Sequence, residues 1–376
     1  MIKSQNSVNS LIRYFALSLL LLLFFTFTVE SVLAHESIFR ANMERSGEYK
    51  SQGLKKLKGI KWKYKTLDKV RSSPVVSGNN LYFGSNDGFL YALNKNSGKE
   101  LWKFKTKSEI YSSPTIDSGV VYFGSNDGNL YAVNVNNGQL KWSYQTSAEI
   151  NSSPIIKNGV IYFGGLDTYV YALDSSSGKL LWKFKTQRGI VSSPAISNEV
   201  LYIGSLDNNL YAIDINSGNE LWKFIAEDIL VSIPAVSEGK VFFGVQDTHL
   251  YALDVKTGKL VWDIKTDGGI LDWLYSFPAV NKDSVFIGGV DSMYSFNKKT
   301  GKRNWKFHTL RAVSSPSVAD TVLYFGGNDK ILYALDSRTG KELWRFETEG
   351  EIETSPIIDN AVVYFGSNDG YVYALD

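Results

Sequence analysis

Residues 112–146 read Ser-Ser-Pro-Thr-Ile-Asp-Ser-Gly-Val-Val-Tyr-Phe-Gly-Ser-Asn-Asp-Gly-Asn-Leu-Tyr-Ala-Val-Asn-Val-Asn-Asn-Gly-Gln-Leu-Lys-Trp-Ser-Tyr-Gln-Thr, and most of the chain repeats this unit. Every proline of the chain marks one copy: Pro74, Pro114, Pro154, Pro194, Pro234, Pro278, Pro316 and Pro356. Tryptophans recur at the same interval, at Trp62, Trp102, Trp142, Trp182, Trp222, Trp262, Trp305 and Trp344. A repeat of about 40 residues with several short strand patterns is typical of a β-propeller.

Each unit predicts four short strands, A to D, separated by turn residues. In the unit above, strands B and C (120–124 and 130–133) are almost continuously apolar, as expected for central strands that neighbouring blades cover on both faces. Strand D (140–144) alternates, and lysines on its copies suit an outer edge. Strand A (113–116) carries the proline, which cannot donate to a ladder, so we place it at the inner edge, facing the central channel.

The number of strands predicts how the ring closes. Eight A-B-C sets are present, and the last of them ends at Asp376 without a strand D. A D-like strand, 61–66, precedes the first set. We therefore predict an all-β, eight-bladed propeller of four-stranded antiparallel blades, closed by the N-terminal strand in the last blade. Deletion of 59–66 is expected to destabilise the ring far more than deletion of 35–50, because only the former removes a paired strand.

The chain before the repeat divides into two segments. Lys3 and Arg13 precede an apolar run at 14–29, and Val32 and Ala34 provide the small side chains that a signal peptidase accepts, so 1–34 is expected to be a signal peptide and His35 the first mature residue. The alternative is an uncleaved membrane anchor, although the run is short for a membrane span. Residues 35–58 are polar and are interpreted as a solvated linker before the propeller at 59–376.

Composition excludes several classes of protein. A 44% apolar content allows a large core, and a net charge of +2 gives no basic excess that would indicate nucleic acid as a partner. The chain has no cysteine, which excludes disulfides and a lipid-modified N-terminal cysteine. We expect an exported protein, periplasmic or at the cell surface, monomeric, and in contact with a membrane only through its signal or anchor segment.

Four recurring motifs resemble the pyrroloquinoline-quinone-type propeller repeat. They are Ser-Ser-Pro, Val-Tyr-Phe-Gly-Ser-Asn-Asp-Gly, Leu-Tyr-Ala-Leu-Asp and Thr-Gly-Lys-Glu-Leu-Trp. Residues 39–42 (Phe-Arg-Ala-Asn) and 45–47 (Arg-Ser-Gly) resemble the segment that often precedes such propellers. The resemblance implies the fold. It leaves two functions open, because the repeat occurs in quinone-dependent alcohol dehydrogenases and in non-enzymatic propellers of the BamB type, which act in outer-membrane assembly.

No catalytic or metal site is expected. An aspartate recurs in each turn between strands B and C, where its side chain caps backbone amides, so its repetition follows from the turn; these are Asp87, Asp127, Asp167, Asp207, Asp247, Asp291, Asp329 and Asp369. The three histidines have no metal-ligand spacing. The quinoprotein resemblance implies adjacent cysteines, a calcium site and a catalytic aspartate on inserted loops, and these insertions are absent, so no cofactor is expected.

Function is expected where the copies differ. The position three before each proline varies most and falls in the D-to-A connections, around one mouth of the channel. The copy before Pro278 is four residues longer than its neighbours, and its connection (267–275) carries the only tryptophan outside the D strands. It is either a tolerated insertion or a recognition loop. The candidate partner-binding residues on this face are Arg71, Tyr111, Asn151, Glu227, Asp228, Asp272, Trp273, Tyr275 and Glu353.

These features favour a non-catalytic interaction scaffold with protein partners, in envelope or outer-membrane protein assembly by resemblance to the BamB type. A dehydrogenase dependent on pyrroloquinoline quinone is the first alternative. A surface propeller that binds carbohydrate or peptide is the second.

Overall fold

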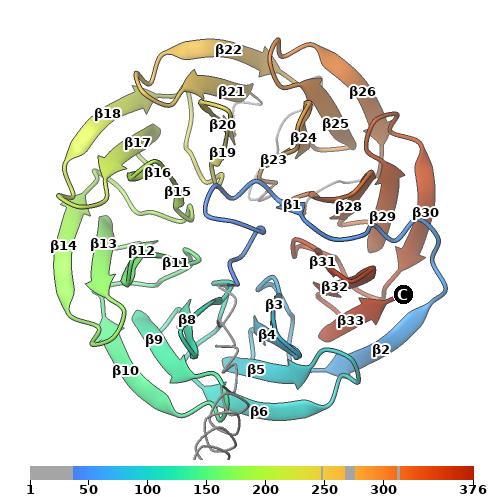
Figure 1. The fold of residues 1–376 in the computed structure, drawn as a ribbon, viewed down its shortest axis with the longest axis horizontal. Helices are drawn as coiled ribbons and strands as arrows, with labels where there is room; N and C mark the ends of the chain where they lie inside the picture. The colour runs from blue at the N-terminus through green and yellow to red at the C-terminus, as the bar shows by residue number, and fades with distance from the viewer. Residues whose placement is uncertain (1–36, 247–248, 267–275, 311–313) are drawn as a thin grey trace, which may run out of the picture. The chain divides into compact units, whose positions relative to one another are not determined.

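The computed structural model of the protein describes residues 37–246, 249–266, 276–310 and 314–376. Eight antiparallel blades surround a central channel, and the first strand of each blade lies nearest the channel while the fourth lies outermost (Figure 1). This is the eight-bladed propeller that the repeat predicts. In the described part of the chain, no helix has the length and apolar character that a membrane span requires.

The blades follow one another along the chain. Blade 1 comprises β3 (Val75–Ser77), β4 (Asn80–Gly84), β5 (Phe89–Asn94) and β6 (Glu100–Lys105). Blade 2 comprises β7 (Thr115–Asp117), β8 (Val120–Gly124), β9 (Asn129–Asn134) and β10 (Leu140–Gln145). Blade 3 comprises β11 (Ile155–Lys157), β12 (Val160–Gly164), β13 (Tyr169–Asp174) and β14 (Leu180–Lys185). Blade 4 comprises β15 (Ala195–Ser197), β16 (Val200–Gly204), β17 (Asn209–Asp214) and β18 (Glu220–Ile225).

The second half repeats this arrangement. Blade 5 comprises β19 (Ala235–Ser237), β20 (Lys240–Gly244), β21 (His249–Asp254) and β22 (Leu260–Lys265). Blade 6 comprises β23 (Ala279–Val280), β24 (Ser284–Gly288), β25 (Ser292–Asn297) and β26 (Arg303–His308). Blade 7 comprises β27 (Ser317–Ala319), β28 (Val322–Gly326), β29 (Ile331–Asp336) and β30 (Glu342–Glu347), and β1 (Glu48–Tyr49) pairs in parallel with β27. Blade 8 comprises β31 (Ile357–Asp359), β32 (Val362–Gly366), β33 (Tyr371–Leu375) and β2 (Ile60–Lys65).

The Ser-Ser-Pro mark and the glycine that ends strand B act together. In every blade the first hydroxyl residue of the mark accepts a hydrogen bond from the backbone N–H of that glycine, as from Gly84 to Ser72 at 3.0 Å. The Ser72 hydroxyl in turn donates to the carbonyl of Ser112 in the next blade at 3.0 Å. The two marks therefore recur together because one hydroxyl joins strand B of its own blade to the neighbouring blade.

The recurrent aspartates have the turn-capping role that the sequence predicts. Asp127 accepts hydrogen bonds from the backbone N–H of Asn129 at 2.9 Å, the Tyr131 hydroxyl at 2.8 Å and the backbone N–H of Lys107 at 3.0 Å. Burial alone would raise the pKa of Asp127, but these hydrogen bonds outweigh it and lower that pKa. Equivalent bonds to the tyrosine of strand C are accepted by Asp87, Asp167, Asp207, Asp329 and Asp369. Asp291 departs from this pattern and accepts a hydrogen bond from the Ser292 hydroxyl at 2.8 Å, and Asp247 lies outside the described residues.

The core lies between the blades, where each tryptophan contacts the next blade. The indole N–H of Trp62 donates to the carbonyl of Lys95 at 2.8 Å, and Trp102 makes the same bond to Val135 at 3.0 Å. The acceptor in each case directly follows strand C. A Cβ at Gly98 would lie 2.7 Å from the Trp62 ring, and Gly98 has φ +70°, so both the space and the backbone conformation require glycine there.

Closure uses more of the N-terminal segment than the predicted strand. β2 pairs with β33, as predicted (Figure 1). Trp344, the last tryptophan of the repeat, finds its acceptor not in blade 8 but at the carbonyl of Leu54, at 2.7 Å. The backbone N–H of Leu54 also donates to the Tyr324 hydroxyl. The segment from Leu54 to β2 therefore replaces both the C-to-D turn and strand D of blade 8.

The prediction of a solvated linker is wrong for the described residues 37–58. Phe39, Arg40, Arg45 and Leu54 are buried, and the segment passes through the central channel (Figure 1). Carbonyl groups along it, such as that of Met43, accept backbone N–H donors from the inner strands of blades 2, 4, 5, 6 and 7. The physical reason is that the inner edges of the blades present unpaired backbone groups, which this polar segment satisfies.

Raising the pH above 10 is expected to unfold the ring cooperatively. Burial raises the pKa of Tyr122, Tyr162 and Tyr202 to about 12, and these side chains are each 2% exposed. The unfolded chain loses these protons near the ordinary tyrosine pKa of about 10, so their contribution to stability is complete below that pH and is lost as the pH rises towards 12. Tyrosinate absorbance and near-ultraviolet circular dichroism should change together. Ionisation of these tyrosines near pH 10 with the fold retained would contradict this.

Candidate functional site

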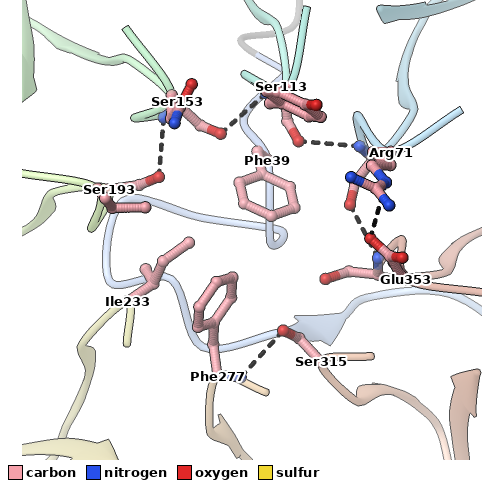
Figure 2. Close-up of a pocket in the computed structure, with 14 residues that line it drawn as sticks. Phe39, Arg71, Ser113, Ser153, Ser193, Ile233, Phe277, Ser315 and Glu353 are labelled. Carbon is pink, nitrogen blue, oxygen red and sulfur yellow. Dashed lines mark hydrogen bonds and ion pairs between the residues drawn. The ribbon is translucent and has the colours of Figure 1, made fainter. Parts of the chain in front are cut away.

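A cavity of about 270 Å³ lies at the mouth of the channel where the D-to-A connections meet, and we call it the channel cavity. Four residues that the sequence singled out line it: Arg71, Tyr111, Asn151 and Glu353. Below them lie the second serines of the Ser-Ser-Pro marks, and Phe39 from the N-terminal segment stands in the middle (Figure 2). The repeat thus brings together residues that are far apart in the sequence. Ser73 and Ser355 are 282 residues apart, and the backbone N–H of Ser355 donates to the Ser73 hydroxyl at 2.8 Å.

Arg45 holds the N-terminal segment beneath this cavity. Its side chain is fully buried and donates to the carbonyls of Phe39 at 2.6 Å, Pro194 at 3.0 Å, Pro154 at 3.0 Å and Ser153 at 3.1 Å. Burial lowers the pKa of Arg45 to about 9, which leaves the guanidinium charged at neutral pH. Carbonyl dipoles from blades 3 and 4 therefore replace the water around this cation.

Arg40 anchors the segment on the opposite side. It is 1% exposed and donates to the carbonyl of Pro278 in blade 6 at 2.6 Å and to that of Arg45 at 3.3 Å. Its guanidinium carbon lies 6.0 Å from the centre of the Phe277 ring. Burial lowers the pKa of Arg40 to about 10, so this side chain also carries its charge at neutral pH.

The polar part of the rim is an ion pair with supporting groups. Arg71 Nε lies 3.1 Å from Glu353 Oε2, and both side chains are partly exposed. The amide nitrogen of Asn368 donates to Glu353 at 2.6 Å, and the Arg71 guanidinium carbon lies 5.8 Å from the centre of the Tyr111 ring. These contacts join blade 8 to blades 1 and 2 and leave this part of the lining without net charge.

The other part of the wall is apolar because two copies depart from the repeat. The residue directly before the proline is serine in six blades but Ile233 in blade 5 and Phe277 in blade 6. Where serines are present, their hydroxyls accept backbone N–H donors from the preceding blade, as from Ser73 to Ser113 at 3.0 Å. Ile233 is 3% exposed, and Figure 2 shows it and the Phe277 ring beside Phe39, facing the ring of serines.

The remaining predicted residues divide into two groups. Glu227 and Asp228 lie in the connection between β18 and β19 but do not line the channel cavity; Glu227 is exposed and Asp228 accepts a hydrogen bond from the backbone N–H of Ile229 at 2.7 Å. Asp272, Trp273 and Tyr275 lie outside the described residues.

Sequence reasoning missed three side chains of this site: Phe39, Ile233 and Phe277. The signals were present, since Ser-Ile-Pro and Ser-Phe-Pro break the Ser-Ser-Pro mark and Phe39 stands in the motif that resembles a segment before such propellers. The most variable position of the repeat lies three residues before the proline, whereas these two breaks lie directly before it.

The lining was also tested for a quinone cofactor and a metal. Pyrroloquinoline quinone carries three carboxylates, whereas the cavity wall offers one cation, Arg71, whose charge Glu353 already balances. Phe39 stands in the middle of the cavity floor (Figure 2). Among the residues that the structure describes, no three histidine, aspartate or glutamate side chains gather as metal ligands. The residues present therefore do not fit this cofactor.

Comparison with known proteins supports the fold and indicates a family. A family model described as "Outer membrane protein assembly factor BamB" matches residues 52–183, 166–305 and 271–376. The crystal structure of BamB from Moraxella catarrhalis is similar, with a TM-score of 0.72 and 20% identity over 84% of this chain and 97% of that one. No curated protein sequence matches the chain significantly.

Two further solved structures share the fold. The computationally designed Ika8 protein has a TM-score of 0.73 and 20% identity over 86% of this chain and 99% of that one. Quinohemoprotein alcohol dehydrogenase from Comamonas testosteroni has a TM-score of 0.78 and 13% identity over 90% of this chain and 80% of that one. At such identities the likeness concerns the fold alone.

Proposed function

Because the chain belongs to the family described as outer membrane protein assembly factor BamB, we propose that it is an exported, non-catalytic propeller that serves as a protein-interaction scaffold in envelope protein assembly. The observation that carries the proposal is the mouth formed by the D-to-A connections. The blades share one framework, yet there they present an ion pair, an aromatic ring, an amide and apolar side chains in place of a repeated residue. A partner would be recognised by the residues that differ between blades, because the rest of the framework is the same in every blade.

Export is part of the proposal. The apolar run at 14–29 and the small residues before His35 support a signal peptide and a location in the periplasm or at the cell surface. Mass spectrometry of the protein from the cell envelope and the medium checks this. A mature chain that begins at His35 is the expected product, and an intact Met1–Ala34 segment in the membrane fraction would replace the signal by an anchor.

The function is tested by capture of partners from detergent-solubilised envelope. The tagged protein should retain outer-membrane assembly components, and Trp273→Ala or Tyr275→Ala should weaken capture about 30-fold if either residue is a buried anchor worth about 2 kcal/mol. Arg71→Val probes the ion pair on the same face, and valine already stands at this position in two described blades. Arg345→Val is the matched control, because it removes an ion pair with Glu342 on the outer strand β30.

Two results would count against the proposal. Suppose that Arg71→Val, Trp273→Ala and Tyr275→Ala leave capture unchanged and that Arg345→Val abolishes it. The function would then belong to the outer edge of the ring. Stoichiometric binding of pyrroloquinoline quinone, with calcium-dependent dye reduction, would favour the dehydrogenase function. That alternative is supported by the similarity of fold to a quinohemoprotein alcohol dehydrogenase.

A further inference from the structure

The channel cavity has the size of a receptor for one side chain. Pockets for drug-sized ligands usually measure about 300–1,000 Å³, and an apolar cavity of about 150 Å³ already holds a benzene ring. The 270 Å³ present here lies between these values. It admits one aromatic ring together with the peptide group that carries it.

The walls favour an aromatic ring. Phe39, Tyr111 and Phe277 contribute three rings, and Ile233 adds an aliphatic surface. Aromatic side chains pack well against other rings in edge-to-face and offset arrangements. The channel already holds one such side chain from its own chain, since Phe39 is 3% exposed and lies with its ring 5.3 Å from the Arg45 guanidinium.

The polar groups in the lining favour a neutral ligand. Asn151 contributes an uncharged amide, and the second residues of six Ser-Ser-Pro marks contribute hydroxyl groups. Because Arg71 and Glu353 balance each other, a charged ligand would find no unpaired charge among the side chains that line the cavity.

From these observations we infer that the channel cavity receives a single aromatic side chain from a protein partner. The inference rests on the proposed function and names the class of residue that the scaffold recognises. Arg71, Tyr111, Asn151 and Glu353 of the described D-to-A connections line the cavity, so the partner segment would approach from that face of the ring.

The first experiment uses small probes of known structure. N-acetyl-L-tryptophanamide and N-acetyl-L-phenylalaninamide are titrated into the protein, in the form that the cell exports, and binding is followed by saturation-transfer NMR. N-acetylglycinamide is the matched control for the peptide groups, and glucose tests a carbohydrate site. We expect the aromatic amides to bind at least tenfold more tightly than the glycinamide. Equal binding of these probes, or tighter binding of glucose, would overturn the inference.

Variants borrowed from other blades keep the fold and change the cavity. Ile233→Ser and Phe277→Ser restore the residue that six other blades carry. Each should weaken the aromatic probes at least tenfold. Leu221→Ser is the control, because Leu221 lies on the outer strand β18 and is 52% exposed. Unchanged affinity in both cavity variants, with circular dichroism like that of the original protein, would contradict the inference.

A second readout separates this inference from the proposed function. If the protein captures envelope partners and Phe277→Ser abolishes that capture while Leu221→Ser does not, both stand. If capture persists in both cavity variants, the scaffold function stands and the cavity is not its receptor. If aromatic probes bind as expected but no envelope component is captured, the cavity is a receptor and the proposed assembly function fails.

Discussion

Replacing Arg45 by methionine lowers the free energy of unfolding by at least about 3 kcal/mol, because each buried carbonyl left without a donor costs about 1–3 kcal/mol. Three carbonyls lose their donor, those of Phe39, Ser153 and Pro194, whereas the Pro154 carbonyl keeps the Thr115 hydroxyl at 2.7 Å. Methionine relieves the burial of a charge, yet it offers no N–H group to these acceptors, so the loss of hydrogen bonds decides the sign. Denaturant unfolding gives the midpoint and slope that measure the change.

The control for this variant is Arg338→Met. Arg338 has a side chain that is 75% exposed and lies 3.6 Å from Asp336, so its replacement should shift the free energy by no more than about 0.5 kcal/mol. Arg45→Lys should fall between the two, since lysine retains a charge and fewer donors. An Arg45→Met protein with the original midpoint would show that the segment in the channel contributes nothing to the stability of the ring.

The second large effect is expected on removing the closing segment. Two chains fused to the same export signal, one beginning at Ser51 and one at Leu67, both lack the buried arginines, so their difference isolates residues 51–66. The Leu67 chain leaves β33 as an open edge and leaves the Trp344 indole N–H without its acceptor at Leu54. We expect it to associate through that edge or to lose its cooperative unfolding transition.

Light scattering after size exclusion and the unfolding midpoint measure the difference between the two chains. Trp62→Ala, which removes one buried side chain from the same segment, should cost about 3–5 kcal/mol. Monomers of both chains with equal midpoints would contradict closure by β2. Deletion of residues 35–50 is also expected to destabilise the ring, because β1 within them pairs with β27 and the two arginines are buried.

The repeat predicts the blades well because each copy carries the physical cause of its own structure. The turn aspartate, the glycine of strand B and the apolar strands B and C all lie within one unit, so their bonds are local or join adjacent units. The closing strand was predictable too, since it resembles its seven counterparts. The N-terminal segment was not, because Arg40 and Arg45 look like solvated residues, and the carbonyls that join them to the blades, such as those of Pro278 and Pro194, are more than a hundred residues away.

The candidate site shows the same limit. Arg71, Tyr111, Asn151 and Glu353 occupy one repeat position, and the ring brings them to one cavity as the spacing implies. Phe39 belongs to no repeat, and it fills part of the channel beneath these residues. A segment outside the periodic pattern therefore decides the depth of the site, and periodicity carries no information about it.

The way blade 8 is built has a consequence for the order in which the protein folds. Its outer strand β2 is synthesised about 300 residues before its other three strands, yet the backbone N–H of Lys58 ends hydrogen-bonded to the carbonyl of Asp376 at 2.7 Å. β2 must therefore stay unpaired until β33 has been made. If the protein is exported as proposed, β2 stays unpaired until β33 has also crossed the membrane, and during that interval it is available to chaperones and to other chains.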